Sequence, residues 1–286
     1  SGIGCSSRFP YYMDTYGFHT IHGRAPAIAS GVKLANPDLS VWVVTGDGDG
    51  LSIGGNHTIH LLRRNLDINV MLFNNRIYGL TKGQYSPTSE VGKVTKSTPM
   101  GSLDRPFNPL TLALGAGATF VSRTIDKETK HLQEMIKRSH VHKGTSFMEI
   151  YQNCNIFNDG AFSQLTDRDS KLDSVLWLEN NSPMIFGVEK NKGIRLDGNI
   201  PKVVEIGKKW SVDDVLVHDE SDYVIASLLS NMTYNEDFPD PIGVLYAIED
   251  TTYEDMMMDQ INEAAKKKDK GTIQDIINAG DTWVVK

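Results

Sequence analysis

Two short polar segments that could do chemistry follow apolar runs in the first third of the chain. Gly46-Asp47-Gly48-Asp49-Gly50 comes directly after the β-branched run Val41 to Thr45. In open α/β sheets ligands bind outside the carboxyl ends of strands, and glycines before a helix let backbone N–H groups approach a phosphate. Because Asp47 would repel a phosphate, we interpret the motif as a site where Mg²⁺ lies between Asp47 and phosphate oxygens.

The second segment, Asn74-Asn75, follows the apolar run Ile68 to Phe73, with 25 residues between Gly48 and Asn74. If the two runs are neighbouring strands, their carboxyl ends lie within reach of one ion. The amide oxygen of Asn75 and the main-chain carbonyl of Ile77 could then join Asp47 as ligands, with phosphate and water completing the octahedron. Each segment alone is commonly just a turn or the start of a loop. Their shared strand–helix–strand setting favours the metal site.

The elements that must position these segments alternate between helix and strand. We expect helices over 25–35, 52–65, 108–115 and 127–139, and strands over 41–45, 68–73, 119–122 and 146–151. This alternation predicts an α/β fold with a doubly wound, mostly parallel sheet. Residues 76–106 form a long irregular stretch rich in Gly, Ser, Thr and Pro, and such a loop is usually functional or mobile.

Beyond Cys154 the alternation of predicted helices and strands becomes less regular. We expect an α/β domain over 1–225, with an irregular C-terminal extension over 226–286 that packs against a partner. One or two helices are predicted between Met256 and Ala279, and residues 158–200 are polar and rich in turn signals.

Composition excludes several classes of protein. The 286 residues are 40% apolar with a net charge of −7, which argues against a nucleic-acid partner. No apolar run approaches the roughly 20 residues of a membrane span, so we expect no membrane contact. Two cysteines do not make a disulfide scaffold, and they fit a reducing, cytoplasmic setting.

Gly-Asp-Gly followed about 25 residues later by Asn-Asn resembles the thiamine diphosphate motif of decarboxylases, synthases and transketolase-like enzymes. The resemblance implies that Asp47, Asn75 and the carbonyl of Ile77 hold Mg²⁺ on the diphosphate. The motif identifies the cofactor and leaves the reaction open.

Further segments narrow the choice of family. The segments Ser1-Gly2-Ile3-Gly4-Cys5-Ser6, His19-Thr20-Ile21-His22-Gly23-Arg24-Ala25 and Gly79-Leu80-Thr81-Lys82-Gly83-Gln84-Tyr85-Ser86-Pro87-Thr88 resemble β subunits of 2-oxoacid:ferredoxin oxidoreductases, particularly the 2-oxoglutarate type. Residues 54–57 and 216–220 extend the likeness, which is strong to about residue 155 and thinner afterwards.

The resemblance implies oxidative decarboxylation of a 2-oxoacid to CO₂ and an acyl-coenzyme A, with electrons passing through a 4Fe-4S cluster to ferredoxin. The partner α (or α/γ) subunit of that family supplies the glutamate that activates thiamine diphosphate. The chain alone is therefore expected to be inactive.

The family holds its cluster with four cysteines, of which Cys5 and Cys154 match two. The other two belong to a Cys-x-x-Cys pair near the amino terminus that this sequence lacks. A cubane cluster takes four thiolates, so we expect an incomplete ligand set here and a missing N-terminal segment. Without the resemblance, two ordinary buried cysteines would be the simpler interpretation.

Other roles are implied residue by residue. Gly48 and Asp49 would cradle the diphosphate, and Lys82 and Arg8 are candidates to bind the substrate carboxylate. The remaining candidates would line the thiamine pocket: Ile3, Gly4, Cys5, Ser6, His22, Gly79 and Leu80. Taken alone, His22 would more often be a structural histidine, and Lys82 and Arg8 could equally be solvated surface cations.

Three other interpretations remain open. A non-oxidative thiamine decarboxylase or carboligase would keep the Mg²⁺ site without a cluster. A non-catalytic scaffold subunit would retain only the fold, although the intact Asp47 and Asn75 argue against it. A generic nucleotide-binding domain is disfavoured, because the loop has neither Gly-x-Gly-x-x-Gly nor Gly-Lys-Ser/Thr.

Overall fold

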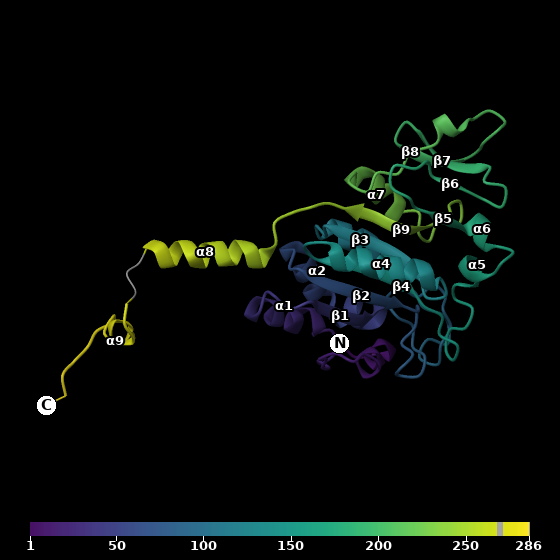
Figure 1. The fold of residues 1–286 in the computed structure, drawn as a ribbon. Helices are drawn as coiled ribbons and strands as arrows, with labels where there is room; N and C mark the ends of the chain where they lie inside the picture. The colour runs from purple at the N-terminus through teal and green to yellow at the C-terminus, as the bar shows by residue number, and fades with distance from the viewer. Residues whose placement is uncertain (268–270, 286) are drawn as a thin grey trace.

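A six-stranded sheet forms the centre of the computed structural model, which describes residues 1–267 and 271–285 (Figure 1). Its strand order is β1-β2-β4-β3-β9-β5. The first four strands run parallel: β1 (Val41–Gly46), β2 (Ile68–Asn74), β4 (Ser146–Tyr151) and β3 (Phe120–Ile125). β9 (Asp240–Ala247) pairs antiparallel with β3, and the short β5 (Val175–Trp177) runs parallel to β9.

Helices cover both faces of this sheet. α1 (Ala25–Ala35), α2 (Gly55–Arg64), α3 (Pro109–Gly115) and α7 (Tyr223–Ser230) share one apolar cluster with Val43, Val70 and Phe147 of the strands. α4 (Thr129–Val141) packs on the other face, against the neighbouring strand residues Val44, Met71 and Met148. Successive strand residues point to opposite faces, so both faces of the sheet bury apolar side chains. The prediction of a doubly wound, mostly parallel α/β fold is confirmed.

The local sequence accounts for where several helices begin. Asn108 accepts hydrogen bonds from the backbone N–H groups of Leu110 and Thr111, and so caps α3. Asp222 caps α7 in the same way. Side-chain oxygens at this position satisfy the free N–H groups of the first turn. The predicted elements before residue 152 lie within a few residues of the observed ones, and residues 76–106 contain no helix or strand.

The C-terminal third differs from its prediction. The boundary expected after residue 225 falls inside α7, and β9 beyond it is a strand of the main sheet. The segment 226–286 therefore contains a strand of the main sheet in addition to the expected helices. β9 pairs antiparallel with a strand more than 100 residues away, and only the tertiary structure reveals such a pairing.

Smaller elements surround the sheet. A three-stranded antiparallel sheet contains β6 (Ile185–Phe186), β7 (Lys192–Asp197) and β8 (Ile200–Glu205). The short helices are η1 (Cys5–Tyr12), η2 (Asp49–Ile53), α5 (Ser163–Thr166), α6 (Lys171–Ser174) and η3 (Val212–Asp214).

The last helices stand away from the body as an arm (Figure 1). α8 (Tyr253–Lys267) and α9 (Ile273–Ile277) lie where helices were predicted, although residues 268–270 fall outside the described part. Within the described residues, no helix is both long enough and apolar enough to cross a membrane.

Candidate functional site

Parallel pairing brings the two polar motifs to one edge of the sheet. Gly46 lies opposite Phe73 in the β1–β2 ladder, so Asp47 and Asn74 follow directly at the carboxyl ends of adjacent strands. Asp47 is 2% exposed and Asn75 is 8% exposed. The predicted neighbourhood of these residues is therefore present, at the strand edge outside which open sheets bind ligands.

The Asp47 carboxylate is held by the long loop. Ser86 and Thr88 donate hydrogen bonds to its Oδ2 at 2.5 and 2.6 Å. Burial raises the pKa of Asp47, and the two hydroxyls and nearby backbone N–H groups oppose that shift. Because both hydroxyls donate to Oδ2, Oδ1 is the oxygen that could bind a cation. A buried carboxylate with no positively charged side chain bound to it is a suitable ligand for a divalent cation.

Asn75 and Ile77 complete the candidate metal ligands. The Oδ1 atom of Asn75 accepts a hydrogen bond from the N–H of Ile77 at 3.3 Å, which fixes the side chain at the start of the loop. An amide oxygen has a second lone pair that remains for a cation. The three oxygen donors, from Asp47, Asn75 and Ile77, have the chemistry that Mg²⁺ prefers.

Gly48 is required by the ring of Tyr78. A β-carbon built on Gly48 would lie 2.2 Å from that ring, and the Tyr78 hydroxyl donates to the Gly48 carbonyl at 2.9 Å. The backbone of the motif is thus clamped against the loop that follows β2. Any side chain at position 48 would displace Tyr78.

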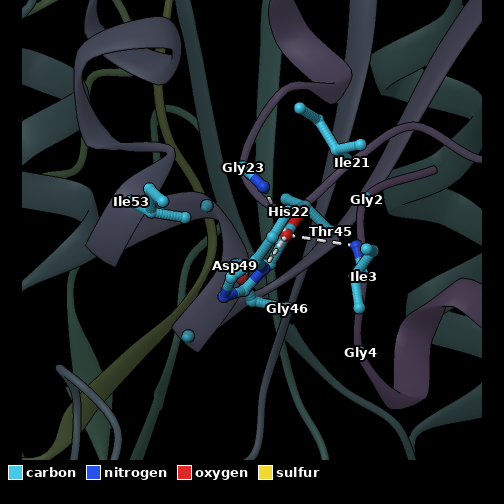
Figure 2. A network of polar contacts seen from close by, with 12 residues as sticks. Gly2, Ile3, Gly4, Ile21, His22, Gly23, Thr45, Gly46, Asp49 and Ile53 are labelled. Atoms are coloured by element: carbon cyan, nitrogen blue, oxygen red, sulfur yellow. Dashed lines mark hydrogen bonds and ion pairs between the residues drawn. The ribbon is translucent and has the colours of Figure 1, made fainter.

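Asp49 is an organising residue rather than a free ligand (Figure 2). Its Oδ1 accepts from the backbone N–H groups of Ile3 and Gly23 at 3.1 and 2.7 Å and contacts Nδ1 of His22 at 2.6 Å. Its Oδ2 accepts from Thr45 at 2.6 Å. Both oxygens thus have protein partners, and the cradling of a diphosphate by Asp49 stays a prediction.

The same network orients His22. A ring nitrogen that contacts a carboxylate acts as the donor, so Nδ1 of His22 donates to Asp49. The His22 side chain is 38% exposed, so part of the ring remains accessible. The interaction therefore supports both a structural role for His22 and a place in the pocket wall.

The Ser6 hydroxyl is a buried polar group without a hydrogen-bond partner among the described residues. It lies beside Gly46, where a β-carbon would come within 3.6 Å of it. Buried unpaired hydroxyls are rare in native structures, so this atom fits a site that binds a polar cofactor group. Gly4, at the start of η1, precedes it, and Ile3 is 42% exposed.

Residues 78–84 form a small hairpin beside the motifs. Backbone hydrogen bonds join Tyr78 to Gln84 and Gly83 to Tyr78. Leu80 and Lys82 lie at its exposed tip, and Lys82 has a φ of 77°, which is costly for a residue with a side chain. Arg8, in η1, is also exposed.

Cys5 and Cys154 come together although 148 residues separate them. A β-carbon built on Gly79 would lie 3.1 Å from one sulfur and 3.6 Å from the other. Burial raises the pKa of Cys5, and the neighbouring Cys154 raises it further. The described residues contain no group of three or more His, Cys, Asp or Glu side chains able to hold a metal ion. The two thiols alone therefore do not fit a complete 4Fe-4S site.

Several known proteins are similar to this chain. Residues 2–150 match the family of the thiamine pyrophosphate enzyme, C-terminal TPP binding domain. The 2-oxoglutarate oxidoreductase subunit KorB of Mycobacterium tuberculosis is 50% identical over 292 residues, covering 100% of this chain and 77% of that protein. The 2-oxoglutarate synthase subunit KorB of Methanocaldococcus jannaschii is 42% identical over 200 residues, covering 70% of this chain and 73% of that protein.

The chain belongs to the β subunits of 2-oxoacid:ferredoxin oxidoreductases.

A solved structure extends the similarity to the fold of this β subunit. It is the 2-oxoglutarate:ferredoxin oxidoreductase from Magnetococcus marinus with 2-oxoglutarate, coenzyme A and succinyl-CoA bound, with a TM-score of 0.74 and 34% identity. The match covers 97% of this chain and 80% of that one. The β subunit therefore carries the thiamine pyrophosphate-binding domain of an oxidoreductase.

Several residues of the site had no role assigned from the sequence of this β subunit. Ser86 and Thr88 bind Asp47, Thr45 binds Asp49, and Tyr78 clamps Gly48. The only sequence signal was the density of hydroxyl residues in 86–89, which also suits an ordinary loop. Their roles depend on how 76–106 folds back over the sheet edge.

Proposed function

We propose that this chain is the β subunit of a 2-oxoglutarate:ferredoxin oxidoreductase of the cytoplasm. In this proposal the enzyme converts a 2-oxoacid and coenzyme A to acyl-coenzyme A and CO₂, and ferredoxin accepts the electrons. The two relatives named for 2-oxoglutarate support this substrate. The single observation that carries the proposal is the buried Asp47–Asn75 pair at the carboxyl edge of β1 and β2, which suits a Mg²⁺-diphosphate anchor.

Three oxygens of this chain would hold the Mg²⁺: Asp47, Asn75 and the carbonyl of Ile77. Gly48 would offer its backbone N–H to the diphosphate. When bound, thiamine diphosphate supplies the electron sink that lets a 2-oxoacid lose CO₂. Because the partner α subunit completes the site, the isolated β subunit is proposed to bind the cofactor without turning over substrate.

Residues around the anchor would orient the cofactor and the substrate. Ile3, Gly4, Ser6 and His22 would form one wall of the pocket, with Asp49 fixing the position of that wall. Gly79 and Leu80 would form the opposing wall. Lys82 and Arg8 are exposed cations flanking the site, and they would bind the substrate carboxylate before the partner closes over it.

Cys5 and Cys154 would supply two of the four thiolates of a 4Fe-4S cluster. Their convergence at Gly79 supports this pairing. The raised pKa of Cys5 would fall once a metal binds, because coordination deprotonates a thiol. The other two cysteines are not in this sequence.

Replacing Asp47 tests the proposal. Asp47→Asn removes the charge that would bind Mg²⁺, so we expect Mg²⁺-dependent binding of thiamine diphosphate to weaken at least tenfold in the assembled enzyme. Calorimetric titration with the cofactor, at several Mg²⁺ concentrations, measures this. Asp104→Asn, in the same loop region but bound only to the exposed Tyr85 hydroxyl, is the matched control and should bind normally. Equal affinities in the wild type and Asp47→Asn would overturn the proposed anchor.

Membership of this family disfavours the alternative that the sequence left open, a non-oxidative thiamine decarboxylase or carboligase. The convergence of two cysteines beside the cofactor site favours the oxidoreductase, since a decarboxylase has no use for a cluster. Reduction of ferredoxin by the assembled enzyme with 2-oxoglutarate and coenzyme A distinguishes them. Release of CO₂ without ferredoxin reduction would support the alternative.

A further inference from the structure

A buried ion pair joins two adjacent strands of the main sheet, β3 and β4. Arg123 of β3 and Glu149 of β4 are both fully buried, and Nε of Arg123 lies 2.7 Å from Oε2 of Glu149. Thr233 accepts a hydrogen bond from Nη1 of Arg123 at 2.7 Å, and Asp240 lies 3.7 Å from the same nitrogen. Buried ion pairs are weak contributors to stability compared with apolar packing. The proposed function assigns neither residue a task.

The pair is linked to the metal motif by Asn74, the first asparagine of the Asn-Asn segment. Nδ2 of Asn74 donates to the free oxygen of Glu149, Oε1, at 2.7 Å. Oδ1 of Asn74 contacts the Thr88 hydroxyl at 2.9 Å and accepts from the Arg76 N–H at 3.2 Å. Asn74 is 0% exposed, so these contacts are shielded from bulk solvent.

Glu149 determines which way the Asn74 amide faces. The two ends of an asparagine amide have nearly the same shape, and only the surrounding donors and acceptors distinguish them. Both oxygens of Glu149 act as acceptors: Nε of Arg123 donates to Oε2 at 2.7 Å, and Oε1 faces the Asn74 amide. The NH₂ group of Asn74 is therefore the end that points toward Glu149.

The carbonyl end of Asn74 therefore points toward Thr88 and the metal anchor. Thr88 has one hydroxyl proton and two acceptors within reach, Oδ1 of Asn74 at 2.9 Å and Oδ2 of Asp47 at 2.6 Å. If the Asn74 side-chain amide rotated by 180°, its NH₂ group would face Thr88. The positive end of the amide dipole would then replace the negative carbonyl oxygen beside the cation site. The orientation set by Glu149 thus favours a cation at Asp47.

We propose that Arg123 and Glu149 are positioning residues for the Mg²⁺-diphosphate anchor, acting through Asn74 and Thr88 on Asp47. This inference rests on the proposed function, because it concerns the same metal ligand. It assigns Asn74 a role distinct from that of Asn75. Asn75 would bind the ion, whereas Asn74 would place its carbonyl oxygen against the Thr88 hydroxyl that contacts Asp47.

Glu149→Gln tests the inference with little change of shape. Its amide could offer an NH₂ group to Asn74 and release the fixed orientation. We expect the Mg²⁺ concentration for half-maximal binding of thiamine diphosphate to rise about tenfold, as is typical when groups that orient metal ligands are changed. Calorimetric titration of the assembled, cofactor-free enzyme measures this without relying on turnover.

Asp240→Asn is the matched control. It removes the same charge from the other side of Arg123, but Asp240 makes no hydrogen bond to Asn74. We expect its Mg²⁺ requirement to stay within twofold of the wild type. If Asp240→Asn raises the requirement as much as Glu149→Gln does, the effect is general loosening of the core and the inference fails.

The outcomes separate this inference from the proposed function. A wild-type enzyme that binds no thiamine diphosphate in the presence of Mg²⁺ overturns both. A wild type that binds, together with a Glu149→Gln variant of unchanged Mg²⁺ requirement, overturns the positioning role alone.

A second pair of variants covers the case in which Glu149→Gln does not fold. Thr88→Val keeps the shape of Thr88 but removes its hydroxyl, and should also raise the Mg²⁺ requirement about tenfold. Thr88→Ser restores the hydroxyl and should restore the affinity. Equal Mg²⁺ requirements in the Val and Ser variants would overturn the inference.

Discussion

At the scale of single residues, the site is organised by carboxylates with different tasks. Asp47 and Asp49 are two positions apart and both are buried. Asp47 is bound by two hydroxyls on one oxygen, which leaves the other for a cation. Both oxygens of Asp49 accept hydrogen bonds from protein donors. These bonds connect the amino-terminal loop and residues 22–23 to β1. Charge-assisted hydrogen bonds of this kind are roughly twice as strong as neutral ones.

Gly2 shows how closely the amino-terminal loop packs on Asp49. A β-carbon at Gly2 would lie 1.7 Å from Oδ2 of Asp49, so Gly2→Ala must displace the loop or the carboxylate. We expect a loss of about 1–3 kcal/mol in the free energy of unfolding, the usual range for overpacking. Urea denaturation of the assembled enzyme measures it.

Gly4→Ala is the control for this prediction, because a β-carbon there meets only the Ser6 hydroxyl at 3.8 Å. Its free energy of unfolding should change by less than about 0.5 kcal/mol. Two alanine variants of equal stability would show that the loop adjusts freely around Asp49.

At the scale of elements, a buried histidine joins the C-terminal part of the chain to the main sheet. His218 is 0% exposed, and its Nε2 donates to the carbonyl of Val244 in β9 at 2.8 Å. Nδ1 has no partner among the described residues. Burial lowers the pKa of His218, while the Val244 carbonyl and the nearby Glu220 and Asp219 carboxylates oppose the shift.

This lowered pKa predicts a loss of stability in mild acid. Below about pH 6.5 the unfolded chain takes up a proton on His218, whereas the folded chain does so only at lower pH. The unfolded state then binds more protons, so the free energy of unfolding falls as pH falls, by up to about 1.4 kcal/mol per pH unit. Melting temperatures between pH 7.5 and 5.5 measure the decline.

His218→Gln keeps an N–H donor for Val244 but cannot titrate. Its melting temperature should decline less over the same pH range than that of the wild type. His131 and His142, whose pKa values burial also lowers, are present in both proteins, so the difference reports His218. If melting temperature falls with pH equally in the wild type and in His218→Gln, the prediction is wrong.

At the scale of the whole molecule, the C-terminal arm contributes little to the core. The described residues from 259 onward are all exposed, whereas Thr252 and Glu254 at the start of α8 are buried. Glu254 accepts a hydrogen bond from the backbone N–H of Asp67 at 3.0 Å, which ties the base of the arm to the body. Apolar side chains along the arm, including Met256, Ile261 and Trp283, are 46%, 51% and 83% exposed.

Deleting residues 259–286 should therefore leave the fold intact. We expect the melting temperature of the β subunit to change by less than a few degrees, because surface residues contribute little to stability. The apolar side chains of the arm suit packing against a partner, so the same deletion should weaken assembly with the α subunit in size-exclusion chromatography. A strongly lowered melting temperature would mean that the arm belongs to the core after all.

The sequence by itself determined the strand and helix order up to Tyr151 and the two motifs at the sheet edge. It could do so because buried parallel strands and helix periodicity are local patterns. It also pointed to the family, which the relatives then confirmed.

Only the tertiary structure decided what the side chains around the motifs do. The resemblance implied that Asp49 cradles a diphosphate, and the structure adds that it contacts loops 26 and 46 residues away along the chain. Ser86 and Thr88 reach Asp47 because the long loop folds back, and Glu149 meets Asn74 because β4 lies beside β2. β9 joins the sheet across more than 100 residues. Such contacts depend on distance in space rather than on local pattern, so no window of sequence contains them.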